Sequence, residues 1–297
     1  MSRPVPVVAL TLLSALVACQ TLLIFHDDDA TDAGVDAGNP EAPIAVEAAP
    51  LDVSVRCDPA CKQPQDGPCK TGSECRSGVC TGAKCVGGLV LYYPFDETAD
   101  ATTIVDWSPS QLNGVRQLGV LGVPGRAGTA MDTRGPGTLG YVQVARDPRL
   151  NPPKMTISVW TTWMPAVGTD PAWGALLVRS SNDNWNDGYG IAMTRDAGAL
   201  YAWAGSDKPT DTPVPFPAGP TFRHVVVTWD GTTLTLYLDG GRAFTQARSD
   251  AGFQLDTELF IGTGHGYFYP WLGAIDELRL FDRVLGENEI TQLYVDP

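Results

Sequence analysis

The stretch Phe222-Arg-His-Val-Val-Val-Thr-Trp-Asp-Gly-Thr-Thr-Leu-Thr-Leu-Tyr-Leu-Asp239 decides the fold of this chain. Along residues 224–229, β-branched and aromatic side chains alternate with a period of two, which indicates a β-strand. Asp230-Gly231 then supplies the positive φ angles of a tight hairpin turn, and residues 233–238 resume the alternation with leucines on one side. The stretch predicts two antiparallel strands. Because a lone hairpin is marginal in water, both strands must lie in a larger sheet.

Further short apolar segments lie on both sides of this hairpin. From Leu89 onward, short apolar segments are separated by Gly and Pro at intervals of about 8 to 12 residues, the pattern of an all-β sandwich. Only Glu287 to Tyr294 has helical spacing, with Ile290 and Leu293 on one face and Gly286 near the cap position. The other predicted strands are 90–95, 141–144, 156–163, 175–179, 190–194, 200–204, 258–262 and 273–281.

Length and charge limit the possible functions. The chain has 297 residues, with 34 acidic against 20 basic side chains and a net charge of -14. This length allows one domain of about 200 residues plus appendages. The negative charge argues against nucleic acid and against an anionic membrane surface as partners.

The N-terminus indicates export. Arg3 precedes an apolar run from Val5 to Ala18, and small residues stand before Cys19. This resembles a bacterial lipoprotein signal, which implies that residues 1–18 are removed and that Cys19 carries the lipid. An uncleaved signal anchor is the alternative, because Thr21 to Phe25 prolong the apolar run to about 20 residues. Gln20 in place of Asp favours the outer membrane, so we expect a cell-envelope lipoprotein of a Gram-negative bacterium.

An acidic segment follows this signal. Residues 19–56 are rich in Asp, Ala, Pro and Gly, and little apolar surface is available to offset the entropy of ordering them. We predict a lipid-anchored, disordered linker. Metal binding by Asp27-Asp28-Asp29 is the alternative, but a flexible run of carboxylates rarely fixes a coordination shell.

Six of the seven cysteines lie in residues 57–86, among Gly, Pro, Lys and Asp. Such a segment has too few apolar residues for a core, so covalent links of about 2 to 4 kcal/mol each must hold it. Zinc prefers Cys-x2-Cys pairs, which are missing here. Six cysteines allow 15 pairings, and the sequence does not choose among them. The predicted disulfide cysteines are Cys57, Cys61, Cys69, Cys75, Cys80 and Cys85.

Seven motifs mark the C-terminal two thirds of the chain. They are Leu91-Tyr-Tyr-Pro-Phe-Asp-Glu97, Gly122-Val-Pro-Gly-Arg-Ala-Gly128, Tyr141-Val-Gln-Val144, Met155-Thr-Ile-Ser-Val-Trp160, His224-Val-Val-Val-Thr-Trp-Asp-Gly231, Leu236-Tyr-Leu-Asp-Gly240 and Gly273-Ala-Ile-Asp-Glu-Leu-Arg-Leu280. In this order they resemble laminin-G-like domains of the concanavalin A-like jelly-roll superfamily. The resemblance implies an antiparallel two-sheet jelly roll over residues 87–297 that recognises carbohydrate or protein. Residues 263–272 depart from the family, because they are richer in aromatic side chains than its typical link.

Catalytic residues are not evident in the sequence. Glycoside hydrolases of the same jelly roll carry clustered carboxylates on one strand, with the two catalytic groups about 5 Å apart. Asp276-Glu277 is the nearest candidate, but adjacent residues on a regular strand face opposite ways. The three histidines, His26, His224 and His265, form no recognisable catalytic or metal-binding set. We therefore predict a protein that is not an enzyme, with a degenerate glycan hydrolase as an alternative.

Calcium is the cofactor that the resemblance favours. Related jelly rolls often hold a structural ion between the first and last strands, which implies Asp96 and Asp276 as ligands. Carboxylate oxygens suit Ca2+, and an exported acidic protein meets this ion at high concentration. The alternative is that Asp276 caps a turn and that Asp96 ends a strand.

Aromatic rings in loops are the candidate ligand-binding residues. Rings with a polar tip stack on sugars, and loops on a rigid scaffold are the usual place for binding. Trp160 and Trp229 lie in alternating strands, so we assign them to the core. We predict a binding protein for glycan or extracellular protein, with a structural or adhesion component without a soluble ligand as the alternative. The candidate rings, expected to be exposed, are Trp185, Tyr189, Tyr267, Tyr269 and Trp271.

Overall fold

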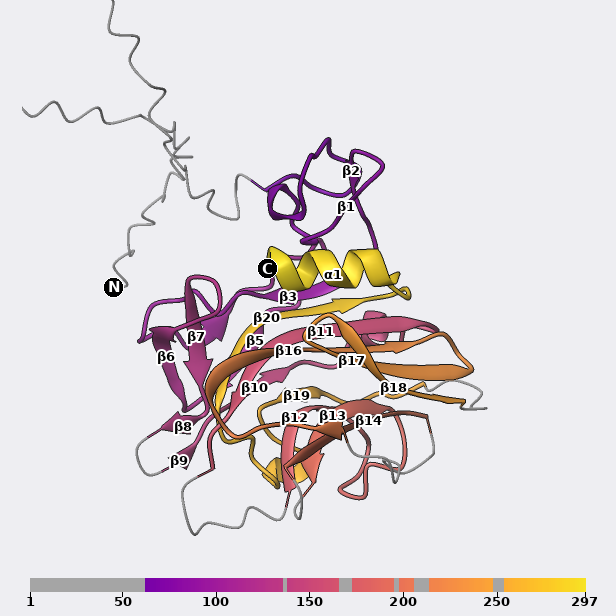
Figure 1. Cartoon of the computed structure of the whole chain (residues 1–297). Helices are drawn as coiled ribbons and strands as arrows, with labels where there is room; N and C mark the ends of the chain where they lie inside the picture. Colours follow the sequence, from indigo (N-terminus) through magenta and orange to yellow (C-terminus); the bar gives the residue numbers. More distant parts are fainter. Residues whose placement is uncertain (1–61, 136–137, 166–172, 195–197, 206–213, 248–253) are drawn as a thin grey trace, which may run out of the picture. The chain divides into compact units, whose positions relative to one another are not determined.

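The computed structural model describes residues 62–135, 138–165, 173–194, 198–205, 214–247 and 254–297 (Figure 1). The chain divides into two compact units, and all described residues belong to the second unit, Val55–Pro297. Cys19, Cys57, Cys61 and the predicted linker lie outside the described residues. Within the described ranges, no helix is long and apolar enough to cross a membrane.

Two antiparallel sheets pack against each other, as the sequence predicts. We call them the front sheet and the back sheet. The front sheet has the order β15-β14-β13-β12-β19-β10-β5-β4. Its strands are β4 (Thr103–Ile104), β5 (Gly114–Gln117), β10 (Tyr141–Val144), β12 (Trp173–Arg179), β13 (Tyr189–Thr194), β14 (Ala199–Ala204), β15 (Val214–Pro215) and β19 (Leu259–Ile261).

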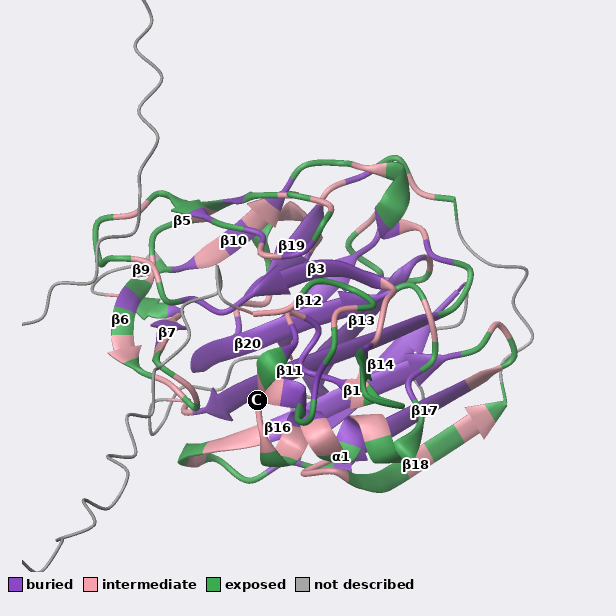
Figure 2. Cartoon of the chain, turned by 90° about the horizontal axis from the view of Figure 1, so that it is seen from above, coloured by how far each residue is buried: buried purple, intermediate pink, exposed green. Residues whose placement is uncertain are grey.

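The back sheet has the order β18-β17-β16-β11-β20-β7-β6, and β3 also pairs with β20. Figure 2 shows β3, β20 and β11 as largely buried strands in the middle of this sheet and β18 as an exposed edge strand. The strands are β3 (Leu89–Tyr93), β6 (Val120–Pro124), β7 (Thr129–Asp132), β11 (Met155–Trp163), β16 (Gly219–Trp229), β17 (Thr233–Leu238), β18 (Gly241–Ala247) and β20 (Ala274–Phe281).

The hairpin of residues 222–239 forms as predicted, because β16 pairs with β17 in antiparallel register. Val225, Val227 and Trp229 are buried in the core between the sheets. The turn differs in one detail. Gly231 has a φ of 98°, but Asp230 does not adopt a positive φ; its Oδ1 instead accepts hydrogen bonds from the Thr232 and Thr233 N–H groups.

The eight strands predicted outside the hairpin all form, with ends that differ by at most two residues. The elements that the sequence did not reveal are short or at an edge. They include β4 to β9, β15 and the largely exposed strand β18. Short polar segments carry too few alternating side chains for a period of two to stand out.

Helix α1 (Glu287–Val295) matches the predicted helix and lies across the outer face of the back sheet (Figure 1). Its start is fixed by Glu289, whose side chain accepts a hydrogen bond from the Gly286 N–H at 2.8 Å. Ile290 and Leu293 are buried against the sheet, together with Val79 of the cysteine-rich module. The module therefore packs on α1 and the back sheet.

Two disulfides hold the described part of the module. Cys69 is bonded to Cys80, and Cys75 is bonded to Cys85. Within residues 62–86 the module otherwise contains only the short 3-10 helix η2 (Gly72–Glu74) and the strands β1 (Cys80–Thr81) and β2 (Lys84–Cys85). The prediction that disulfides replace an apolar core is confirmed for these four cysteines.

Candidate functional site

Aromatic side chains gather on the outer face of the front sheet. In β14, Leu200, Ala202 and Ala204 face the core between the sheets, so the intervening Tyr201 and Trp203 face outward. The loops 180–188 and 262–273 cover this face and add further rings. We call the whole set the aromatic platform: Tyr141, Trp173, Trp185, Tyr201, Trp203, Phe260, Tyr267, Phe268 and Tyr269.

One half of the platform is built around Trp185. Its ring stacks on Trp203 with centroids 5.4 Å apart and an interplanar angle of 5°. The rings of Trp173 and Tyr269 meet it edge-on, at 6.1 and 5.3 Å. Gly190 of β13 makes room for this stack, because a Cβ at that position would overlap the Trp203 ring.

The other half is built around Tyr267. This ring lies 5.7 Å from Phe260 of β19 and 5.1 Å from Tyr141 of β10. Its loop is pinned to the front sheet, because the Ala175 N–H of β12 donates to the Tyr269 carbonyl at 2.8 Å. Figure 1 shows this gold turn beside β12. The two halves are neighbours, because Val178 pairs with both Phe260 and Gly190 across the sheet.

Three platform residues have left-handed backbone conformations. The φ angles are 50° at Trp185, 67° at Tyr267 and 61° at Tyr269. Bulky side chains rarely adopt positive φ, and such strain gathers at functional sites, where the surrounding structure enforces it. Here the fold imposes this cost on residues that present aromatic rings.

Of the five predicted rings, Tyr267 is exposed, with 56% of its surface accessible, and Tyr269 is half-buried. The expected exposure is wrong for the other three. Tyr189 faces the core and donates its hydroxyl to the Leu150 carbonyl. Trp271 packs on Trp163 with centroids 4.7 Å apart, at one end of the core. Trp185 is buried because Trp203 and its other ring neighbours cover it.

Phe268 is 55% exposed and was missed by the sequence analysis, which considered only rings with a polar tip. Tyr201 and Trp203 were missed although a signal existed. Residues 201–204 alternate large and small side chains, and the two rings occupy the face opposite Leu200. An aromatic period of two on the solvent side of a strand was the available clue.

Two polar tips within the platform lack partners in the described part of the chain. They are the Trp185 indole N–H and the Tyr201 hydroxyl, and both side chains are at least 95% buried. Burial also raises the pKa of Tyr201, so its hydroxyl keeps its proton. A buried polar group without a partner costs about 1 to 3 kcal/mol. A ligand or a bound water that reached these tips would recover that energy.

A polar pair joins the two platform loops. His265 Nδ1 lies 2.8 Å from Asp183 Oδ1, and Asp183 is about half exposed. Asp187, in the same loop as Asp183, is engaged with the Ser181 N–H and hydroxyl. The described rim of the platform therefore presents the Asp183 carboxylate to solvent, with the half-buried His265 imidazole beside it.

Asp276 and Glu277 lie on the same face of β20, contrary to the expectation from a regular strand. The register of β11 and β20 shifts between Ser158 and Trp160, and Glu277 has a φ of 50°. This bulge turns both carboxylates outward, towards α1 and the module. Both are buried, so their shared face does not expose them.

The two acids are bound to different partners. Glu277 accepts the Tyr92 hydroxyl at 2.9 Å and pairs with the buried Arg279 at 2.6 Å. The Arg279 guanidinium also lies 4.1 Å from the centre of the Tyr92 ring. Burial and the nearby Glu277 raise the pKa of Asp276 well above its ordinary value. These groups form a buried polar network under the module.

The proposed calcium ligands are held by the loop of residues 125–129. The Arg126 and Ala127 N–H groups donate to Asp276 Oδ2 at 2.6 and 3.1 Å, and the Thr129 N–H donates to Asp96 Oδ1 at 2.6 Å. These donors favour the charged carboxylates, but burial outweighs them and raises the pKa of both groups. Among the described residues, the only convergence of three or more His, Cys, Asp or Glu side chains is the disulfide-bonded set Cys69, Cys75 and Cys85. Calcium at Asp96 and Asp276 stays a prediction.

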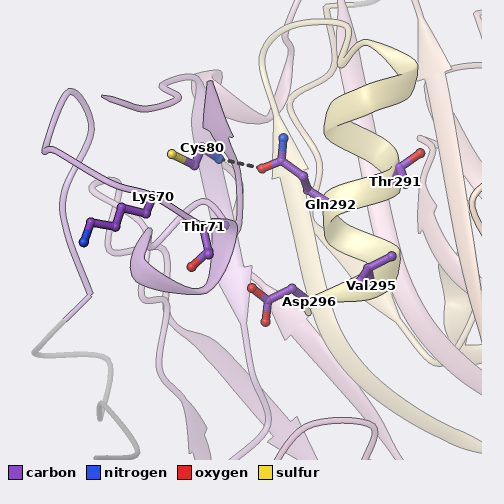
Figure 3. A pocket seen from close by; sticks show the side chains of 8 residues that line it. Lys70, Thr71, Cys80, Thr291, Gln292, Val295 and Asp296 are labelled. Carbon is purple, nitrogen blue, oxygen red and sulfur yellow. Dashed lines mark hydrogen bonds between the residues drawn. The ribbon is translucent and has the colours of Figure 1, made fainter. Parts of the chain in front are cut away.

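A groove of about 380 Å³ lies between the module and α1 (Figure 3). The Cys80 N–H donates to Gln292 across it at 2.9 Å, and Asp296 accepts the Ser73 N–H. No aromatic ring lines the groove, and Val295 is its one large apolar side chain. We therefore place the candidate binding site on the platform.

These features define a class of protein: an antiparallel two-sheet β-sandwich with a ring-rich outer face on one sheet. A laminin-G family model, described as the Concanavalin A-like lectin/glucanases superfamily, matches residues 136–291, a little more than half of the chain. The chain belongs to this superfamily. No curated protein matches it.

Three solved structures show the same fold. The binding domain of Paraclostridial Mosquitocidal Protein 1 is 18% identical, with a TM-score of 0.54 over 70% of this chain and 52% of that one. Domain 4 of AbnA, an arabinanase of Geobacillus stearothermophilus in complex with arabinotriose, is 17% identical, with a TM-score of 0.51 over 69% of this chain and 98% of that one. The Trypanosoma rangeli sialidase is 18% identical, with a TM-score of 0.52 over 72% of this chain and 34% of that one. The chain thus spans about half of the first structure, and identities this low establish the fold alone.

Proposed function

We propose that this chain is a cell-surface binding protein whose aromatic platform binds carbohydrate. The observation that carries the proposal is the platform itself, with Tyr267 and Phe268 exposed on one loop and two unpartnered polar tips among the rings behind them. Flat apolar rings with a few fixed polar groups are what a glycan site requires. Two large exposed aromatic side chains on adjacent residues are unusual on a surface that binds nothing.

The superfamily and one structural neighbour support this proposal. The AbnA domain was solved with arabinotriose bound, and 98% of its length corresponds to this chain. It shows that a sandwich of this kind can hold a sugar chain.

The decisive experiment is a glycan array probed with the full chain. Tyr267→Ala and Phe268→Ala should each weaken binding to the captured glycans by about tenfold, because each removes a stacking surface worth about 1 to 1.5 kcal/mol. Val295→Ala is the matched control, because Val295 is also exposed but lies at the groove beside α1. Unchanged binding by both platform variants, or no bound glycan at all, would contradict the proposal.

We further propose that the protein is held at the envelope by a lipid on Cys19 and acts without catalysis. The support is the signal-like N-terminus and the burial of Asp276 and Glu277. Metabolic labelling with a palmitate analogue should mark the wild-type protein and not Cys19→Ser. Incubation with the captured glycans should release no shorter products, and measurable release would instead favour the hydrolase alternative.

A further inference from the structure

The polar groups of the platform carry information about the charge of its ligand. This inference rests on the proposed function, because it names the class of glycan that the platform takes. The loops that cover the platform, 180–188 and 262–273, contain no Lys or Arg. Their Asp and His side chains are Asp183, which is exposed, and the half-buried Asp187 and His265. Asp187 is held by Ser181, and His265 Nδ1 faces Asp183.

The arginines of the front sheet are engaged elsewhere. Within the described front-sheet strands these are Arg116 and Arg179. Arg116 donates to the Ala101 and Gly119 carbonyls at 2.6 and 2.8 Å. Arg179 is fully buried and donates to the Leu150 and Leu255 carbonyls. Neither guanidinium is free to meet an anionic ligand.

The donors and acceptors present fit hydroxyl groups. The Trp185 indole N–H only donates, the Tyr201 hydroxyl donates or accepts, and the Asp183 carboxylate only accepts. A sugar hydroxyl does both, so its chemistry matches all three groups, of which the Asp183 carboxylate is the one exposed to solvent. A carboxylate or sulfate on the ligand would meet Asp183, a like charge, and would find no cation in the described part of the platform.

We infer that the platform selects neutral, hydroxyl-rich oligosaccharides and rejects their acidic counterparts, with Asp183 as the specificity-determining residue. Asp183 accepts hydrogen bonds from ring hydroxyls and repels anionic sugars. His265 positions it through the contact at 2.8 Å.

The test is an array of matched pairs, each a neutral oligosaccharide beside the same oligosaccharide carrying a terminal sialic acid or a sulfate. The full chain should bind the neutral member at least about tenfold more tightly, a difference of about 1.4 kcal/mol. Binding of the neutral member should also change little with ionic strength, because no ion pair is formed.

Asp183→Asn keeps the shape of the side chain and an oxygen for His265 but removes the charge. We expect it to weaken binding of the neutral member by a few-fold and to reduce the ratio of the affinities for the neutral and the acidic member. Asp256→Asn is the matched control, since Asp256 is 86% exposed and pairs only weakly with Arg146 at 3.4 Å; it should leave both affinities unchanged. Equal or tighter binding of acidic members would overturn this inference and leave the proposed function standing. A chain that binds no member of any pair would overturn both.

Discussion

The outer faces of the two sheets are covered in different ways. The back sheet is closed by α1 and the cysteine-rich module, and it buries Arg279, Glu277, Asp276 and His224 underneath them. The front sheet is covered by two loops and carries rings, of which Tyr267 and Phe268 remain exposed. Enclosed charges make the back face sensitive to substitution. On the front face, substitution of the open rings should cost the fold little, and this is the face on which we propose that carbohydrate binds.

The largest effect should come from breaking the buried pair of the back face. Arg279→Met would leave Glu277, with only 4% of its side chain exposed, without its cation. Removing one partner of a buried pair costs about 3 to 5 kcal/mol. We expect a loss of that size in the free energy of unfolding, measured by urea denaturation.

The matched control is Arg242→Met. Arg242 pairs with Glu287 at the surface, where the side chains are 57% and 61% exposed, so its loss should cost less than about 1 kcal/mol. If the two variants lost equal stability, the buried network would not be what distinguishes the back face.

Acid should weaken the back face through His224. This ring packs beside Trp160 and Tyr294, with centroids 5.0 and 6.0 Å away, and its Nε2 lies 2.9 Å from the Ser158 hydroxyl. Burial and the guanidinium groups of Arg279 and Arg126 lower the pKa of His224 from 6.5 to about 3. Because the folded-state pKa lies below the unfolded value, the stabilisation is complete above pH 6.5 and is lost as the pH falls towards 3.

The contribution of His224 should be on the order of 3 kcal/mol between about pH 7 and about pH 4. His224→Gln removes the titrating group, so its stability should fall less with acid than that of the wild type. Asp276 works in the other direction, because its raised pKa favours the folded state as the pH falls, and it is present in both proteins. If the free energy of unfolding fell equally with pH in the variant and the wild type, His224 would not be a group that gains a proton on unfolding.

The sequence predicted the sandwich because the evidence for it is local. Alternation in residues 224–238 marks which side chains face the core, and this pattern depends only on residues that are neighbours in the sequence. The platform depends on contacts between distant segments. Trp271 and Phe268 share one loop, yet Trp271 is fixed by the Thr162 carbonyl and the Trp163 ring of β11, whereas Phe268 meets solvent. Composition alone does not separate them.

The carboxylates of β20 teach the same lesson. The expectation that Asp276 and Glu277 face opposite ways follows from a regular strand, and a bulge against β11 overturns it. A bulge is set by the register of two strands that are more than 100 residues apart, here at Trp160 and Asp276. In addition, Tyr201 and Trp203 were readable in the sequence as an outward period of two, but that pattern alone does not say that a loop brings Trp185 onto them.

The front face should tolerate changes that the back face does not. Phe268→Ser removes an exposed ring, and its effect on the free energy of unfolding should stay within about 0.5 kcal/mol, as for ordinary surface sites. Phe281→Ser, in the buried cluster under α1, is the matched substitution and should cost several-fold more. A large loss of stability from Phe268→Ser would mean that this ring supports the fold, which would weaken its role as a ligand contact.

Another small effect concerns Asp96, which follows β3, and Asp276 of β20. Calcium bound by Asp96 and Asp276 would raise the melting temperature by mass action, by an amount set by the ratio of its concentration to its Kd. Because backbone N–H groups already occupy three of the positions around these carboxylates, we expect a gain of less than about 1 kcal/mol between EDTA and excess Ca2+. Asp96→Asn should abolish that gain if the ion lies there. A gain of several kcal/mol would instead show that the closed face depends on a metal as well as on α1 and the module, and the contrast between the two faces would then include an ion.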